Sequence, residues 1–167
     1  DSRTAQIYAS VGGILGIKKL PRLYVARFPI SPMLYGYVKP RIVIPDLEFS
    51  DEERIRTILA HELIHHRRGD LYVKLACTAA AAVHWFNHAI HAAVSRCNAS
   101  MELACDAAVL RELGDASRSA YGTTLLDIVR RCEGVKDSPM TTGMNATAGA
   151  VKEGIMNILD TGKKKRG

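Results

Sequence analysis

The sequence has no Cys-x-x-Cys pair, because its four cysteines, Cys77, Cys97, Cys105 and Cys132, lie far apart along the chain. This spacing excludes a zinc knuckle built from thiolates and a thioredoxin-type redox motif, and it favours a reducing compartment. Aromatic residues are also scarce, at 6% of the 167 residues. Arginines do not alternate with aromatic side chains, so we do not expect a stacking platform for single-stranded nucleic acid.

The sequence has neither an internal repeat nor a low-complexity tract, and 47% of its residues are hydrophobic against 24% charged. This balance predicts one globular domain spanning residues 1–167. The net charge of +6 would suit nucleic acid or an anionic membrane surface where basic residues cluster, as they do at residues 163–166. Because a stacking platform is missing, we expect no nucleic-acid partner.

The chain begins without methionine or an apolar leader, which indicates an excised piece or a processed product of a longer protein. Residues 75–94 carry no fixed charge, but alanines and three histidines, His84, His88 and His91, disfavour a membrane span. We expect a buried or amphipathic helix there, with contact to a membrane as one option. The histidines share a helix face, which we interpret as partly buried or interfacial rather than as a second metal site.

Two regions of secondary structure are predicted. Short β-favouring runs cover residues 22–27, 34–38 and 41–44, and prolines keep these strands short, which favours a small antiparallel sheet. Helical periodicity is weak over residues 2–17 and strong after Ser50, which forms a capping box with Glu53.

That capping box predicts a helix over residues 51–68, which ends before Gly69. Further helices are expected over residues 70–83, 88–113, 117–131 and 148–159, with a loop over residues 132–147. The predicted fold class is therefore α+β: a mostly helical domain with a small N-terminal antiparallel sheet.

The helix expected over residues 51–68 contains His61-Glu62-Leu63-Ile64-His65, the His-Glu-x-x-His pattern of zinc metalloproteases. Residues four apart lie one turn apart on the same helix face, so both imidazoles can bind one ion. Glu62 lies about 100° further round the helix, beside the metal, where a general base belongs. The alternative is a surface helix that carries these residues by chance.

Two histidines leave a catalytic zinc short of a ligand, because such a site usually has three protein ligands and one open position. Glu102 and Asp106 stand four residues apart on the helix expected over residues 88–113. Glu102 is the candidate third ligand, and Asp106 is the candidate acceptor of a hydrogen bond that fixes the tautomer of a ligand histidine. The alternative is a solvated acidic helix face.

These residues resemble the zinc-peptidase domain of the BlaR/MecR-type β-lactam-sensing antirepressors. Three segments carry the resemblance: His61-Glu-Leu-Ile-His-His-Arg-Arg-Gly-Asp70, Trp85-Phe-Asn87 and Glu102-Leu-Ala-Cys-Asp-Ala-Ala-Val-Leu110. Residues 31–45 and 121–126 are similar to the segments that flank the site in that family. The resemblance spans about residues 31–159.

The resemblance implies a gluzincin-like fold in which His61, His65 and Glu102 bind Zn²⁺, Glu62 is the catalytic base and Asp106 orients a ligand histidine. It also implies a zinc metalloendopeptidase domain of a membrane-anchored sensor, on the cytoplasmic face of the cell membrane. Its partners would be a protein or peptide substrate and the membrane segments of its parent chain. The expected substrate is a transcriptional repressor or the parent chain itself.

Several details stay open at this stage. Tyr121 is a candidate donor to the oxyanion, with a tyrosine that anchors a helix as the alternative. Asp70 is expected to bond Arg67, Arg68 or a ligand histidine. An antiparallel edge strand over residues 35–44 could align an extended substrate.

Two other functional classes compete with a peptidase. One is a non-catalytic regulatory domain in which zinc only joins two helices, and the other is a membrane-surface or nucleic-acid-binding module driven by positive charge. Glu62 argues against the first, because a structural zinc site needs no base and is usually closed by four protein ligands.

Overall fold

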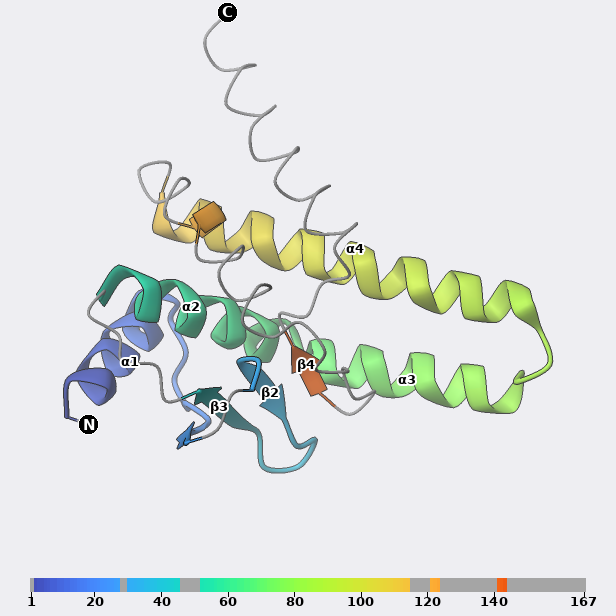
Figure 1. The fold of residues 1–167 in the computed structure, drawn as a ribbon, viewed down its shortest axis with the longest axis horizontal. Helices are drawn as coiled ribbons and strands as arrows, with labels where there is room; N and C mark the ends of the chain where they lie inside the picture. The colour runs from blue at the N-terminus through green and yellow to red at the C-terminus, as the bar shows by residue number, and fades with distance from the viewer. Residues whose placement is uncertain (1, 28–29, 46–51, 115–120, 124–140, 144–167) are drawn as a thin grey trace, which may run out of the picture.

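The computed structural model describes residues 2–27, 30–45, 52–114, 121–123 and 141–143. In chain order, its elements are α1 (Ser2–Ile14), β1 (Arg22–Ala26), β2 (Met33–Tyr35), β3 (Arg41–Pro45), α2 (Glu52–Arg68), α3 (Asp70–Val83), α4 (His88–Leu113) and β4 (Thr141–Gly143). The predicted α+β class is confirmed, since long helices accompany one small sheet (Figure 1).

The sheet is mixed, so the prediction of a purely antiparallel sheet is wrong. Its order is β1-β3-β2-β4, with β1 parallel to β3 and β2 antiparallel to both β3 and β4. The reason is that β2 and β3 form a hairpin whose β3 side, rather than its β2 side, receives β1. β2 therefore lies between β1 and β3 in the sequence, although β1 and β3 are direct neighbours in the sheet.

The position of β4 corrects two further expectations. This strand lies within residues 132–147, which were predicted to be a loop. It also covers the free side of β2, so β2 and β3 are both paired on two sides. The predicted edge strand over residues 35–44 is therefore wrong, and the edges of the described sheet are β1 and β4.

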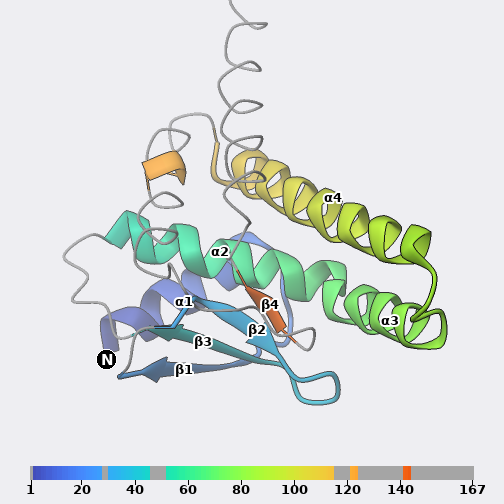
Figure 2. The ribbon, with the colours of Figure 1, turned by 45° about the vertical axis from the view of Figure 1, so that its right-hand side comes forward.

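Helix α2 lies at the centre of the fold, between the sheet with α1 on one side and α4 on the other (Figure 2). Apolar residues at helical spacing account for this position, because Ile58, Leu59, Leu63 and Ile64 are each at most 1% exposed. They pack with side chains from α1, the sheet and α4 into one hydrophobic core. Burial on every side holds α2 in one position.

Helices α3 and α4 follow α2 and form an antiparallel hairpin (Figure 1). Their bounds match the expected ranges of 70–83 and 88–113. None of the described helices is long and apolar enough to span a membrane. The helix expected over residues 148–159 lies outside the described residues, and of the helix expected over residues 117–131 only residues 121–123 are described, as helix.

The turn between β2 and β3 requires glycine at position 36. Gly36 has a φ of +91°, and a Cβ added there would lie 2.8 Å from the Lys39 carbonyl oxygen. We predict that Gly36→Ala lowers the free energy of unfolding by about 1–3 kcal/mol, measured by urea denaturation. The control is Gly13→Ala, whose Cβ would meet nothing within 4 Å; in a helix it should raise that free energy by about 0.5–1 kcal/mol. Equal effects at the two sites would contradict this view of the turn.

Candidate metal centre

Helix α2 brings two histidine side chains together inside the core. His61 and His65 are at most 1% exposed, and their Nε2 atoms lie 3.0 Å apart. Four residues separate them on one helix face, so the predicted convergence of the two rings is present in the structure. Two N–H groups cannot point at each other across 3.0 Å, so at most one proton lies between the rings.

The outer nitrogen of His65 is held by an acidic side chain. Asp70 begins α3, is 3% exposed, and its Oδ2 lies 2.6 Å from His65 Nδ1. Its other oxygen lies 3.3 Å from Arg68 Nε. Asp70 thus contacts two of the three partners that the sequence left open. Because a carboxylate only accepts, His65 donates its Nδ1 proton to Asp70, and Nε2 is the nitrogen left to bind a metal ion.

The outer nitrogen of His61 is held in a comparable way. The Tyr121 hydroxyl donates to Asp106 Oδ1 at 2.5 Å, and its oxygen lies 3.0 Å from His61 Nδ1. Because the Tyr121 hydroxyl donates its hydrogen bond to Asp106, its oxygen accepts a hydrogen bond from the Nδ1–H of His61. Asp106 Oδ1 itself lies 3.4 Å from His61 Nδ1. In His61 too, Nε2 is therefore the nitrogen left to bind a metal ion.

Tyr121 does not occupy the position expected of an oxyanion donor. It is fully buried, and its hydroxyl lies on the Nδ1 side of His61, away from the point where the two Nε2 atoms meet. The structure thus favours the alternative reading of a buried, anchoring tyrosine. Tyr121, which follows His61 by 60 residues, links this histidine to Asp106.

Glu102 reaches the two inward nitrogens from α4. Its Oε2 lies 3.4 Å from His65 Nε2 and 3.6 Å from His61 Nε2. Ligand atoms about 2.0–2.1 Å from a tetrahedral zinc lie about 3.3 Å from one another. The observed separations of 3.0, 3.4 and 3.6 Å have that size, so the three side chains fit one zinc ion.

The charges around Glu102 support a cation at this point. Although burial opposes ionisation, the neighbouring imidazoles of His61 and His65 hold the pKa of Glu102 far below its ordinary value. Lys74 Nζ lies 3.8 Å from the other oxygen, Oε1, with the lysine side chain only 12% exposed. Glu102 is thus an anionic carboxylate whose Oε2 faces the Nε2 atoms of both histidines.

Cys105 is a potential ligand that was missed from the sequence. Its sulfur and the ligand atoms of His61 and His65 all lie within 4.8 Å of one another. Cys105 is fully buried, and its thiol donates to the His61 carbonyl oxygen at 3.5 Å. The signal was present, because Cys105 stands three residues after Glu102 on the same helix. Within the described ranges, His84, His88 and His91 do not bring their ligand atoms together into a second group.

Glu62 lies beside the two histidines with no hydrogen bond of its own. It is fully buried, and neither oxygen has a hydrogen-bond partner among the described residues. Burial raises the pKa of Glu62 from 4.5 to about 7, although the neighbouring histidines pull it down. A carboxylate in this state accepts a proton readily near neutral pH, which is the property of a general base.

These observations define a metallopeptidase-type centre: two histidines one helical turn apart, a carboxylate from a second helix, and a buried base beside them. Comparison with known proteins gives the same class. The family model described as BlaR1 peptidase M56 matches residues 4–158. The chain therefore belongs to the BlaR1 peptidase M56 family, and the resemblance inferred from its motifs is confirmed.

Individual relatives match a shorter part of the chain. The regulatory protein BlaR1 of Bacillus licheniformis is 29% identical over 108 residues, which are 63% of this chain and 18% of that protein. The methicillin resistance mecR1 protein of Staphylococcus aureus is 31% identical over 98 residues, which are 58% of this chain and 17% of that protein. The mecR1 protein of Staphylococcus epidermidis gives the same figures. The matched regions cover less than a fifth of these relatives.

The raised pKa of Glu62 leads to a prediction about stability. Between pH 4.5 and about 7 the folded, metal-free chain holds the Glu62 proton more tightly than the unfolded chain does, so stability falls as the pH rises. Glu62→Gln removes this loss. After treatment with a chelator, the variant should be more stable than the wild type by about 3 kcal/mol above pH 7, with little difference below pH 4.5. Urea denaturation across the pH range measures both.

The matched control is Glu112→Gln on α4. Hydrogen bonding from Arg67 lowers the pKa of Glu112, so this variant should lose a little stability above that pKa instead of gaining it. A stability difference between Glu62→Gln and the wild type that does not change with pH would show that folding does not raise the pKa of Glu62.

Proposed function

We propose that this chain is a zinc endopeptidase domain that hydrolyses peptide bonds in a protein substrate. The observation that supports this most is the convergence of His61 Nε2, His65 Nε2 and Glu102 Oε2 from two helices, beside the unpartnered carboxylate of Glu62. These three atoms would hold the ion, and the donor set of two imidazoles and one carboxylate suits Zn²⁺. Three protein ligands leave one coordination position open.

Glu102 is proposed as the third ligand in preference to Cys105. The Glu102 oxygen lies at separations that fit a shared zinc ion, whereas the Cys105 thiol is engaged with the His61 carbonyl oxygen. A thiol must lose its proton before it binds zinc. Cys105 is the alternative to exclude by experiment.

The chemistry follows from the site. Zinc bound in such a site lowers the pKa of water from about 15.7 towards 7 and polarises a scissile carbonyl. Glu62 accepts the proton of the attacking water on its carboxylate and returns it to the departing amine nitrogen. Asp70 and the Tyr121–Asp106 pair keep both ligand histidines in the tautomer that presents Nε2.

A purely structural zinc site fits the surroundings of Glu62 less well. A buried carboxylate without a hydrogen bond is unfavourable. Such a group has no purpose in a site where zinc only joins two helices. The peptidase function accounts for Glu62, and the structural alternative does not.

We propose that this domain is part of a membrane-anchored sensor and acts at the cytoplasmic face of the membrane, with the parent chain's membrane segments as partners. The names of the relatives, a regulatory protein and methicillin resistance proteins, support a role in antibiotic-resistance signalling. A transcriptional repressor or the parent chain is the proposed substrate. No nucleic-acid partner is proposed.

Replacing the base separates catalysis from metal binding. We predict that Glu62→Gln lowers the rate of cleavage of an unfolded protein by about 10²–10⁴-fold and leaves the zinc content unchanged, because Glu62 is not a ligand. Glu112→Gln is the same substitution at a position on α4 outside the metal centre, and this variant should retain the wild-type rate. Cleavage by Glu62→Gln at the wild-type rate would remove the catalytic assignment.

The ligand set is tested by elemental analysis of the purified chain. We expect one zinc per chain, lost in His61→Ala and strongly reduced in Glu102→Ala, because removal of a ligand opens the site. Cys105→Ser should retain the metal. The opposite pattern, with zinc retained in Glu102→Ala and lost in Cys105→Ser, would show that Cys105 is the third zinc ligand.

A further inference from the structure

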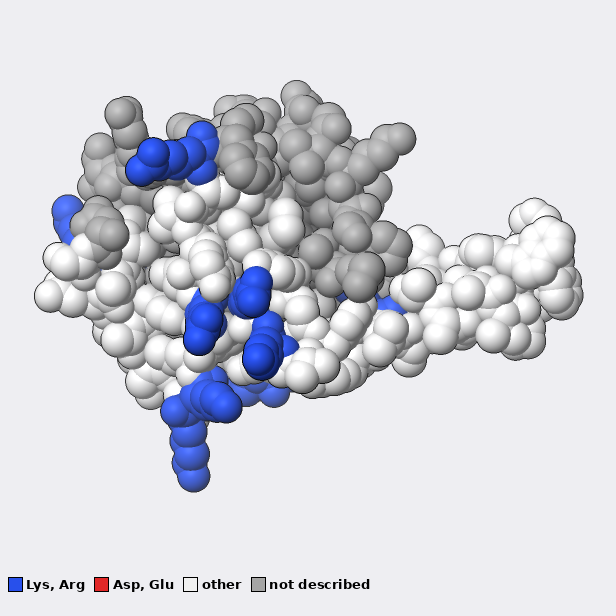
Figure 3. Space-filling model, turned by 90° about the horizontal axis from the view of Figure 1, so that it is seen from below, with Lys and Arg blue, Asp and Glu red and all other residues white. Residues whose placement is uncertain are grey.

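The hairpin of α3 and α4 projects from the body of the protein as an arm. Figures 1 and 3 show its far end extending beyond the sheet and beyond α1 and α2. Residues 84–87 form the turn at the tip. The base of the arm carries Glu102, whereas the tip has no part in the metal centre.

The tip exposes large apolar side chains. Val83 is 69% exposed, Trp85 74% and Phe86 64%. Most other side chains near the end of the arm are alanines, which offer little apolar area. Exposed aromatic residues at a projecting tip indicate an interaction site for a membrane or for another protein.

The arm also lacks charge. Between Lys74 on α3 and Arg96 on α4, the sequence has no Asp, Glu, Lys or Arg. Of the two residues that bound this stretch, Lys74 lies against Glu102 in the interior and Arg96 stands on α4. An arm without fixed charge suits contact with the apolar region of a bilayer, where a charged side chain would be costly.

Hydrogen bonds within the turn hold the backbone of the tip in place. Asn87 caps α4, since its Oδ1 accepts from the Ala89 backbone N–H at 3.0 Å. His91 Nε2 bonds the Trp85 carbonyl oxygen at 2.9 Å. These bonds fix the backbone around Trp85, so its ring points outward from an ordered turn.

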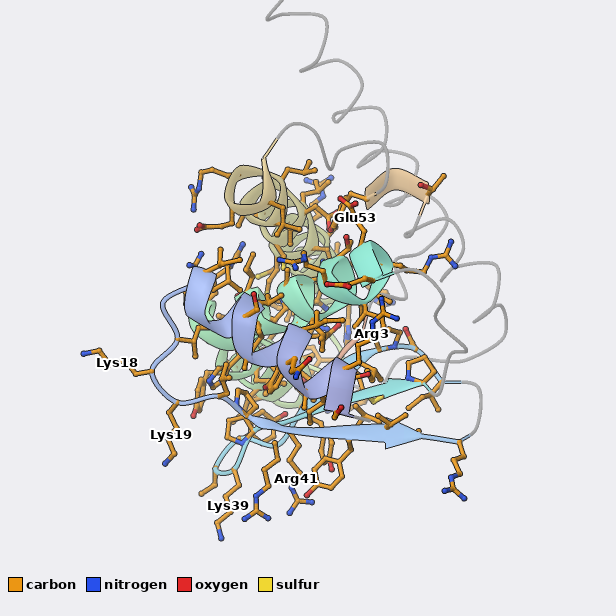
Figure 4. The ribbon with its side chains drawn as sticks, turned by 90° about the vertical axis from the view of Figure 1, so that its left-hand side faces the viewer. Arg3, Lys18, Lys19, Lys39, Arg41 and Glu53 are labelled. Atoms are coloured by element: carbon orange, nitrogen blue, oxygen red, sulfur yellow. The ribbon has the colours of Figure 1, made fainter. Side chains whose placement is uncertain are left out.

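The adjoining face of the body is basic. Figure 3 shows Lys and Arg side chains gathered there and the uncharged arm beside them. Lys18, Lys19, Lys39 and Arg41 project from this side (Figure 4). With the net charge of +6, this face favours approach to an anionic surface.

We propose that the tip of the α3–α4 hairpin inserts into the interface of an anionic lipid bilayer, with the basic face of the body attracted to the headgroups. None of the described helices can span a membrane, and His84, His88 and His91 keep the tip at headgroup level, so the contact is interfacial. A second copy of the chain fits less well. A stable protein interface buries about 800 Å² per partner, and three side chains expose only a few hundred Å². This proposal is independent of the peptidase function.

Trp85 reports on the proposal directly, because it is the chain's one tryptophan. The 167-residue chain is mixed with vesicles of phosphatidylcholine, or of phosphatidylcholine and phosphatidylglycerol in equal amounts. We expect the tryptophan emission to shift to shorter wavelength with the anionic vesicles and less with the neutral ones. Emission that stays the same with both would overturn the proposal. A shift that follows protein concentration without lipid would assign the tip to a second copy and overturn it as well.

Co-sedimentation with the anionic vesicles tests whether the aromatic side chains of the tip contribute to binding. The double variant Trp85→Ser, Phe86→Ser should weaken binding by about tenfold or more, because two aromatic side chains leave the interface. The control Ile14→Ser changes another exposed apolar residue, 52% exposed, and should bind as the wild type does. Binding that survives the double variant but vanishes in moderate salt would assign attachment to the basic residues alone and overturn the proposal. Zinc content and cleavage in solution, measured on the same variants, keep this test separate from that of the peptidase.

Discussion

The structure depends on one constraint: two imidazole nitrogens face each other at 3.0 Å inside a hydrophobic core. Packing of α2 on all sides prevents the rings from turning away, and the groups that contact their outer nitrogens hold both Nε2 atoms at the same point. With the Glu102 carboxylate completing the cluster, three electron-rich atoms meet where water cannot screen them. A divalent cation is the partner that satisfies all three.

The local parts of this arrangement were accessible from the sequence. The helical spacing of His61 and His65 follows from residue periodicity, and so do the bounds of α3 and α4. Glu102 lies on the second of these helices, where the acidic pair with Asp106 directed attention to it. Short-range rules were sufficient because each of these features lies within one helix.

The non-local parts were not accessible. The pairing of β1 with β3 depends on which side of a hairpin the first strand joins, and side-chain alternation is the same for both choices. β4 (Thr141–Gly143) has no apolar alternation that would distinguish it from a loop. The role of Tyr121 depends on contact with His61 across 60 residues, which spacing cannot reveal. Asp70 had three plausible partners, and only packing decides among them.

The hairpin of α3 and α4 connects the metal centre to the proposed lipid contact, because Asp70 and Glu102 stand on the same two helices as the exposed tip. From Glu102 to the start of α4 the helix runs about 20 Å. A domain held by its tip would therefore work close to the bilayer surface, where the membrane-anchored parent chain that we propose would also lie.

The central claim concerns an ion between α2 and α4, and anomalous scattering at the zinc absorption edge from a crystal of the chain tests it most directly. The account predicts a single strong peak at about 2 Å from His61 Nε2, His65 Nε2 and a Glu102 oxygen, with no fourth protein ligand. A map without a peak there, or a peak enclosed by four protein side chains, would contradict it.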